Sequence, residues 1–205
     1  MVRRTKEEAE ETRSLLLDTA EQVFLDKGVA RTSLGDIAQA AGLTRGAIYW
    51  HFKNKVDLFN AMLERARLPM EDNCDIPAPA DEEPFVRIRR QALDVLATTE
   101  TNPHARRVFE IVIHKCEMVD EMAAARERHQ ECRNHCLAEM ESQFKRAVRL
   151  GHMPKTLSAR RAAIGLFALV DGLISNWVLD PEQFSLRRDG ERIVDAYLNG
   201  LRHDC

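Results

Sequence analysis

The chain has 205 residues, of which 44% are hydrophobic and 31% are charged, and its formal net charge is −3. This length fits one large or two small domains, and so mild a charge does not by itself indicate a nucleic-acid-binding protein. The charged first 20 residues do not resemble a secretory signal peptide, and the longest apolar run, 162–178, is too short and too interrupted for a membrane span, so we expect a cytoplasmic protein without a membrane segment.

The first predicted element is a long helix over 5–26. Thr5 and Glu8 have the spacing of a capping box, and apolar residues follow at helical intervals up to Phe24. Gly28 is placed to end this helix, because glycine adopts the left-handed backbone conformation at low cost.

Two short helices joined by a tight turn are predicted within 32–59, TSLGDIAQAAGLTRGAIYWHFKNKVDLF. Ser33 and Asp36 can form a capping box at the start of the first short helix. Gly42 lies where that helix must stop, and Thr44 can cap the second. This layout is typical of a helix-turn-helix, whose second helix enters the DNA major groove.

The second short helix is predicted over 45–51. Ala47, Ile48 and Phe52 form its inward set, which turns the other side chains outward. Two exposed aromatic side chains on so short a helix need a partner surface. The alternative to a DNA-binding motif is a small helical hairpin whose polar residues are simply solvated. From 27 to 55 the chain carries five basic residues and one acidic residue, so basic surface is local to the motif, as attraction to phosphate requires.

Candidate DNA contacts lie on and beside this outward face. Arg45 can donate two hydrogen bonds to a guanine edge. Tyr49, His51 and Lys55 can reach phosphates, which position a protein without reading sequence. The full set of DNA-binding candidates is Thr32, Ser33, Thr44, Arg45, Gly46, Tyr49, Trp50, His51 and Lys55.

A fourth helix is predicted to begin after Asn54 and to end at Leu68, because Pro69 follows. Residues 69–84 contain four prolines and six acidic residues, and we expect them to form a mobile loop.

Only helices are predicted in the remainder, over 85–99, 104–115, 119–150, 158–179 and 186–202. Because no segment has the pattern of a strand, the expected fold class is all-α. An N-terminal three-helix DNA-binding domain with the helix-turn-helix, 1–55, would precede a helical ligand-binding and dimerisation domain, 56–205.

The helix predicted over 158–179 is apolar on nearly every side. Such a helix is buried all round, and in so small a domain one side would have to meet another chain. The last helix is amphipathic and can pair with it, which predicts a homodimer through the last two helices. A dimer presents two recognition helices to a palindromic, double-stranded operator. A central helix buried within a monomer is the alternative.

The middle helices are the expected place for a ligand, since binding pockets are apolar with few polar groups. Asp171 is the strongest candidate for a polar contact with the ligand, because burying a carboxylate among apolar side chains costs free energy unless it is paired. Its alternative role is a bond to nearby backbone or to an arginine, and for the other candidates the alternative is core packing. The ligand-binding candidates are Leu93, Leu96, Phe109, Val112, Ile113, Cys116, Cys136, Met140, Phe144, Phe167, Val170, Asp171, Ile174 and Ser175.

Other chemistry has little support in the sequence. His129, Cys132 and Cys136 share one helix face and could hold a metal, but a single helix rarely supplies a closed site. We therefore predict no metal and no cofactor. The five cysteines are irregularly spaced and are expected to be reduced in the cytoplasm. No glycine-rich phosphate loop, HExxH motif or nucleophile elbow is present, so no enzyme is predicted.

The stretch 12–59 resembles the DNA-binding domain of the TetR family of bacterial repressors. Within it, 28–55, GVARTSLGDIAQAAGLTRGAIYWHFKNK, is similar to the branch that represses multidrug efflux pump operons. The matching residues are Ala20, Phe24, Gly28, Thr32, Ile37, Ala38, Ala41, Gly42, Tyr49, His51, Phe52, Lys55 and Leu58.

The resemblance implies a dimeric repressor of an operon for multidrug efflux and antibiotic resistance. A small hydrophobic or aromatic inducer would enter the C-terminal domain and release the protein from its operator. A different function remains open: a constitutive DNA-binding or architectural protein whose C-terminal part only dimerises. A drug-dependent shift of the melting temperature would discriminate between the two.

Overall fold

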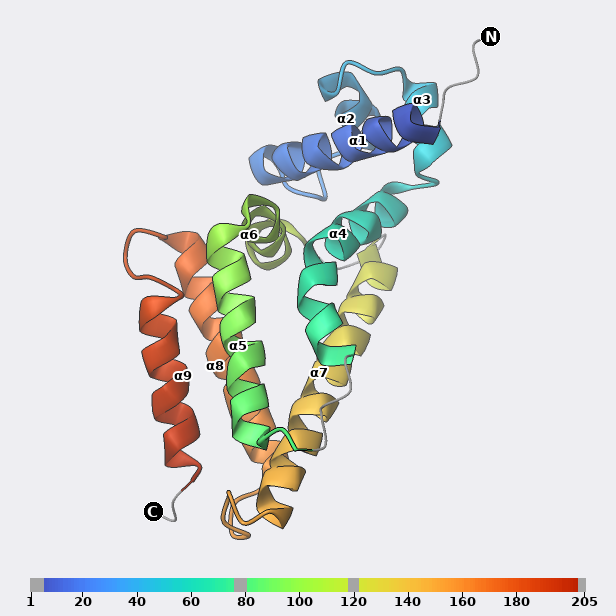
Figure 1. Cartoon of the computed structure of the whole chain (residues 1–205). Coiled ribbons are helices and arrows are strands. Elements are labelled where there is room, and N and C mark those ends of the chain that lie inside the picture. Colours follow the sequence, from blue (N-terminus) through green and yellow to red (C-terminus); the bar gives the residue numbers. More distant parts are fainter. Residues whose placement is uncertain (1–5, 76–80, 118–121, 203–205) are drawn as a thin grey trace. The chain divides into compact units, whose positions relative to one another are not determined.

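The computed structural model describes residues 6–75, 81–117 and 122–202, and the regular elements in these ranges are all helical (Figure 1). The expected all-α class is therefore confirmed, while the proposed cap at Thr5 lies outside the described residues. The elements are α1 (Lys6–Lys27), α2 (Leu34–Ala40), α3 (Arg45–His51), α4 (Lys55–Asp75), α5 (Pro84–Thr101), α6 (Pro103–Glu110), the π-helix η1 (Ile111–Lys115), α7 (Ala123–Arg149), α8 (Ala159–Leu179) and α9 (Arg188–Gly200).

These helices form two compact units. The first contains Met1–Ala66 together with Glu110–Glu127, and the second contains Arg67–Phe109 and Arg128–Cys205. A segment from the middle of the chain thus belongs with the N-terminal helices, which the division at residue 55 did not anticipate.

The first unit has a core of fully buried apolar side chains. Helix α1 packs on α2 and on η1, and α2 packs on α3. Four of these side chains have no exposed surface: Leu16, Phe24, Ile37 and Phe59. The ring centroids of Phe24 and Phe59 lie 6.1 Å apart, and the ring planes are inclined at 60°. Burying side chains of this size contributes roughly 1.5–3 kcal/mol each, which fixes the helices that carry the motif.

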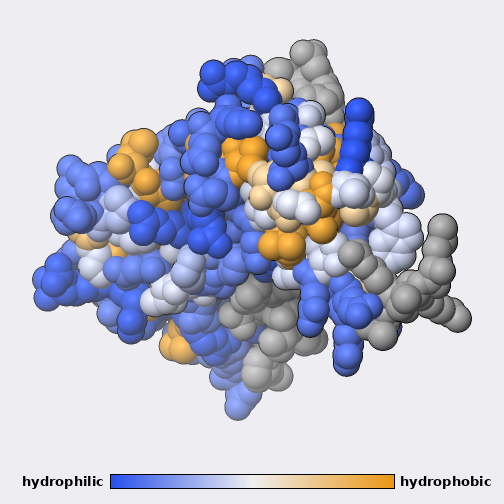
Figure 2. All heavy atoms as spheres, turned by 90° about the horizontal axis from the view of Figure 1, so that it is seen from above, coloured by the Kyte–Doolittle hydropathy of each residue, from blue (hydrophilic) through white to orange (hydrophobic). Residues whose placement is uncertain are grey.

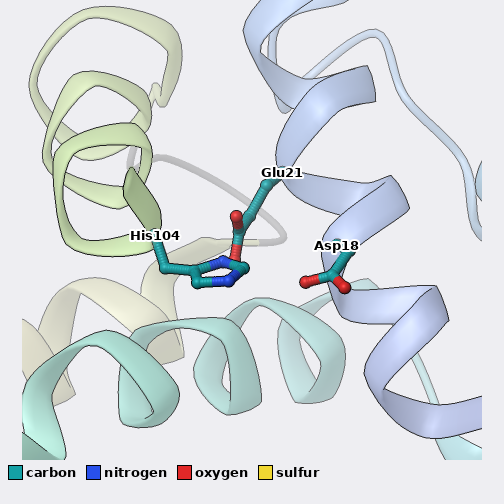
Figure 3. A group of neighbouring side chains, drawn as sticks. All are labelled: Asp18, Glu21 and His104. Carbon is teal, nitrogen blue, oxygen red and sulfur yellow. The ribbon is translucent and has the colours of Figure 1, made fainter. Parts of the chain in front are cut away.

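A charged cluster joins α1 to α4 in the same unit. Figure 3 shows Asp18 and Glu21 on α1, and it also labels His104, which α6 carries in the second unit. Arg65 of α4 pairs with both carboxylates, at 2.7 Å between Nη1 and Oδ1 of Asp18, and Glu21 is fully buried. Removing the arginine would take a charged partner from the buried Glu21 carboxylate, and breaking a buried ion pair costs about 3–5 kcal/mol.

The second unit is built on α5, α8 and α9, which pack against one another (Figure 1). The rings of Phe85 and Phe144 meet edge to face at 5.9 Å. At Gly165 an added Cβ would lie 2.2 Å from the Tyr197 hydroxyl, which donates a hydrogen bond to the Ala162 carbonyl at 2.9 Å. A side chain at residue 165 would therefore displace the Tyr197 hydroxyl where α9 packs on α8.

Two predicted boundaries are wrong. Helix α4 does not end at Leu68 but continues through Pro69 to Asp75; proline removes one backbone hydrogen bond but does not have to end a helix. The expected loop is correspondingly shorter, because α5 begins at Pro84, and 76–80 lie outside the described residues.

Helix α8 is long and apolar enough to cross a membrane by length and composition, contrary to the expectation that its apolar run is too short. In this structure it is a core helix of the second unit, where Leu166, Ile174 and Trp177 are buried. Viewed from above, the surface is mostly hydrophilic and its hydrophobic residues form separate patches (Figure 2).

Candidate nucleic-acid interface

The start of α2 is fixed by the predicted capping box. The Ser33 Oγ accepts a hydrogen bond from the Asp36 backbone N–H at 3.2 Å, and a carboxylate oxygen of Asp36 accepts from the Ser33 N–H at 2.8 Å. The Ser33 hydroxyl also donates to this carboxylate at 2.6 Å. These hydrogen bonds from Ser33 lower the pKa of Asp36.

The turn between α2 and α3 also has the expected form. Gly42 has a φ of 69°, a conformation that favours glycine. The Leu43 N–H donates to the Ala38 carbonyl at 2.9 Å, which satisfies a carbonyl at the end of α2. Thr44 then caps α3, because its Oγ1 accepts from the Ala47 N–H at 3.3 Å.

Two buried anchors, Ile48 and Phe52, hold α3 on the first unit. The opposite face of α3 is exposed, and Trp50 has 73% of its surface accessible. The Arg45 guanidinium lies 5.6 Å from the Tyr49 ring, so a cation and an aromatic face stand side by side. A short helix with this outward surface can enter a major groove and reach both base edges and phosphates.

The remaining outward candidates keep their predicted places. Thr44, Arg45, Gly46 and Trp50 are exposed, and His51 is half-buried with its ring edge-on to Trp50 at 4.5 Å. Ser33 is exposed beside this surface. Their contacts with DNA stay predictions.

Thr32 does not belong to this surface. It is 2% exposed, and its hydroxyl donates to the Gly28 carbonyl at 2.8 Å. Lys55 also differs from expectation, because its ammonium donates to the Val29 and Thr32 carbonyls at 2.9 Å each. Both side chains donate hydrogen bonds to carbonyls of the loop before α2. The carbonyls that Lys55 binds are distant in sequence, so no local pattern predicted its contacts.

The ligand-binding candidates are divided between the two units. Val112, Ile113 and Cys116 belong to the first, where burial raises the pKa of the Cys116 thiol to about 11. So high a pKa leaves little reactive thiolate near neutral pH. The other candidates belong to the second unit: Leu93, Leu96, Phe109, Cys136, Met140, Phe144, Phe167, Val170, Asp171, Ile174 and Ser175.

Within the second unit, Phe167 and Asp171 differ in their surroundings. Phe167 is half-buried, and the Arg133 guanidinium of α7 lies 5.4 Å from its ring. Asp171 was expected among apolar side chains, but it is exposed in the chain. The expected burial of Asp171 is thus not found within one chain, where it lies on the outer face of α8, and its contact with a ligand stays a prediction.

Helices α8 and α9 each have a side that carries exposed residues. On α8 it includes Ile164, which is 45% exposed, Ala168 and Asp171. On α9 it includes Ile193 and Ala196. Their spacing of three to four residues places them on one side of each helix. Leu198, by contrast, is buried.

A small cavity between α5 and α9 was not predicted. Its volume is about 250 Å³, and its lining includes Phe85, Arg89 and Asp195. Arg89 makes two hydrogen bonds to Asp195, at 2.6 and 3.0 Å. The Arg202 guanidinium lies 4.4 Å from the Phe85 ring. The ion pairs of Arg89 with Asp195 and Glu191 join residues more than a hundred positions apart. No local sequence pattern therefore predicts the cavity.

Comparison with known proteins identifies both halves of the chain. Residues 16–62 match the family model of bacterial regulatory proteins of the tetR family, and 83–203 match the C-terminal region of MAATS-type transcriptional repressors. The HTH-type transcriptional regulator TtgR of Pseudomonas putida is 43% identical over 98% of this chain and 97% of that protein.

Solved structures agree with this assignment. NalD, the secondary repressor of the MexAB-OprM multidrug efflux pump in Pseudomonas aeruginosa, is 36% identical with a TM-score of 0.87, over 98% of this chain and 100% of that one. A complex of SmeT with triclosan is 31% identical with a TM-score of 0.81, over 95% and 93% of the two chains. SmeT is the repressor of the Stenotrophomonas maltophilia multidrug efflux pump SmeDEF.

Proposed function

The chain belongs to the TetR family of bacterial regulatory proteins, and we propose that it represses a multidrug efflux pump operon until a hydrophobic drug releases it from its operator. The observation that carries this proposal is the capped helix-turn-helix with Arg45, Tyr49 and Trp50 exposed on α3. Similarity over nearly the whole chain to NalD, an efflux pump repressor, supports the regulated target. The site of action is the cytoplasm, where the operator is.

On the DNA, α3 lies in the major groove. Arg45 donates to a guanine edge from the first turn of α3, where its side chain is exposed. Tyr49 and His51 contact phosphates, with Trp50 beside them on the groove wall. In the free chain the Tyr49 ring stands beside the Arg45 guanidinium, which restricts the guanidinium before DNA arrives.

Two copies join through the outer faces of α8 and α9. Each helix exposes an isoleucine, Ile164 on α8 and Ile193 on α9, and covering these side chains favours association. Two helices from each copy form a four-helix bundle, and its two-fold symmetry matches a palindromic operator.

The inducer is a small hydrophobic or aromatic molecule. Phe167 offers an aromatic wall in the second unit, with the Arg133 guanidinium over its ring, and apolar pockets with one or two polar groups accept such ligands. That SmeT has been solved with triclosan supports this class of ligand. By linkage, the drug weakens operator binding by the same factor by which the operator weakens drug binding.

The test is footprinting with the purified full chain on DNA upstream of its neighbouring genes, with and without aromatic drugs. We expect a protected palindrome that loses protection as the drug is added. A duplex with the same composition but scrambled half-sites is the control and should stay unprotected. Protection that no amphipathic or aromatic compound relieves would favour the constitutive DNA-binding protein instead.

A further inference from the structure

Gln143 on α7 is a buried polar side chain with an unsatisfied hydrogen-bond acceptor. It is 8% exposed, and its side-chain carbonyl oxygen accepts no hydrogen bond from any residue that the structure describes. A buried acceptor of this kind loses the hydrogen bonds that water gives it in the unfolded chain, which costs stability. Few such groups occur in folded proteins, and each needs a physical explanation.

The second unit contains another buried group of this kind, the Trp177 indole N–H, which has no acceptor among the described residues. The large Trp177 ring is 4% exposed, with the Arg106 guanidinium 5.1 Å from its centre, and burial of so much apolar surface stabilises the fold. A glutamine has little apolar surface and is mostly found exposed. Packing therefore accounts for the burial of Trp177, but it does not account for that of Gln143.

Gln143 lies on the side of α7 that carries candidate contacts for the inducer. Cys136, Met140 and Gln143 follow one another at intervals of three to four residues, which places them on one side of a helix. Cys136 and Met140 are half-buried. Phe144 is the next residue, and its buried ring meets the Phe85 ring of α5 edge to face.

The same side of α7 also reaches α8. Arg133 lies three residues before Cys136, and its guanidinium lies 5.4 Å from the Phe167 ring. The series of residues that includes Gln143 therefore faces α8 at Phe167 and α5 at Phe85. Aromatic walls with a small number of polar groups are the usual composition of a site for small molecules.

We infer that the side-chain carbonyl of Gln143 accepts a hydrogen bond from the inducer, which is therefore an aromatic compound with an O–H or N–H donor, such as a phenol or an aromatic amine. The inference rests on the proposed function and narrows its class of ligand. Apolar walls favour any flat hydrophobic molecule through the area that is buried. A buried acceptor favours the molecules that bring a donor, because a ligand without one leaves the acceptor unsatisfied.

Two probes and three proteins test this contact. Para-phenylphenol carries an O–H donor, and its methyl ether has the same two rings without the donor. Binding of each probe to the full-length protein would be measured by titration calorimetry without DNA, for the wild type, Gln143→Met and Gln130→Met. Methionine keeps the unbranched shape of glutamine and removes its carbonyl. Gln130→Met is the matched control, because Gln130 is exposed on the same helix.

For the wild type and Gln130→Met we expect the phenol to bind about tenfold more tightly than the ether, the scale of one hydrogen bond to a buried acceptor. In Gln143→Met this ratio should fall to within about twofold, because binding of the phenol weakens. A ratio that Gln143→Met leaves unchanged would overturn the inference, and water would then be the partner of the carbonyl. A wild-type protein that binds neither probe at its solubility limit would overturn it as well.

Thermal melting supplies a second readout. Gln143→Met removes an unsatisfied buried group, so the free protein should melt about 2–4 °C higher, while Gln130→Met should melt as the wild type does. If Gln143→Met does not fold, Gln143→Leu removes the same carbonyl and should abolish the same preference for the phenol. A lower melting temperature together with an unchanged probe ratio would make Gln143 a purely structural residue.

Neither readout needs an operator, so the proposed function is judged separately by footprinting. Release from the operator by drugs, with a probe ratio that does not depend on Gln143, would keep the repressor and refute the contact. A ratio that depends on Gln143, without release by any drug, would keep the contact and refute the ligand-controlled repressor.

Discussion

Helices α3 and α8 both expose large apolar side chains, but their surroundings differ. On α3, Tyr49 and Trp50 are exposed beside the Arg45 guanidinium. On α8, Ile164 and Leu179 are exposed along a stripe that also carries the small residue Ala168. Aromatic rings with a cation suit a polyanion that offers flat base edges, whereas an aliphatic stripe with small residues suits close packing of a second helix.

Exposure alone therefore does not identify a partner, because the neighbouring side chains decide which surface can cover the exposed one. The contrast supports the proposals that α3 binds DNA and that α8 binds a second copy of the chain. Substitutions confined to one helix should then disturb one kind of binding first, and they can be ordered by the size of their expected effect.

The largest effect is expected from Ile164→Asp on α8. It places an unpaired charge within the proposed bundle, so ultracentrifugation should show monomers. Operator affinity should fall about 100-fold or more, because one protomer reaches one half-site. Leu150→Asp is the control, since Leu150 is comparably exposed, at 53%, but lies beyond the end of α7. A folded Ile164→Asp dimer at micromolar concentration would place the interface elsewhere.

Arg45→Ala on α3 should have the next largest effect. Loss of a bidentate contact to guanine costs about 1–3 kcal/mol of specific binding per half-site. Titration of an operator and of a scrambled duplex should show the loss on the operator alone, with the dimer intact. If the preference for the operator survives, Arg45 does not read bases.

Phe167→Ala should affect induction without affecting DNA binding. Removal of one aromatic wall should raise the drug concentration needed for half-maximal release by about tenfold, while drug-free operator affinity stays close to that of the wild type. Asp171→Asn lies on the outer face of the same helix, which the proposed dimer covers, so it is compared only after ultracentrifugation has shown an intact dimer, and it should then leave the choice of drug unaltered. An altered drug preference in Asp171→Asn would return this carboxylate to the ligand site.

The smallest effect is expected from Asp36→Asn at the start of α2. Because hydrogen bonds from Ser33 lower the pKa of Asp36 below its ordinary value of 3.8, its stabilisation is complete well above that value and is lost as the pH falls through the lowered pKa. The variant should melt about 2 °C lower at pH 7, and the difference should shrink as the pH falls below 3.8 and through the lowered pKa. A difference that persists in acid would show that the charge of Asp36 is not responsible.

The helix-turn-helix could be predicted because its signals are local. The bonds between Ser33 and Asp36, the cap at Thr44 and the left-handed Gly42 all involve residues within a few positions of one another. The all-α fold class follows equally well from helical periodicity and the prolines and glycines that interrupt it.

What could not be predicted depends on distant partners. Lys55 binds carbonyls 23 to 26 residues away, and Arg65 pairs with Glu21 across 44 residues. Asp171 looked buried because its sequence neighbours are apolar, but which side of α8 faces the chain's own core is decided by α5 and α9. Periodicity shows that a helix has faces, and only packing shows what covers each of them.

The inclusion of Glu110–Glu127 in the first unit matters for protein engineering. A hybrid regulator made by one crossover near residue 66 would combine the DNA-binding helices of this chain with the η1 segment of another parent. The Val29 N–H would then face a foreign segment in place of the Lys115 carbonyl that it binds here. The transferable module therefore consists of two separate stretches of sequence. Chimeras that exchange the second unit should keep both stretches of the first unit from the same parent. Libraries that vary only the C-terminal part should leave 110–127 unchanged.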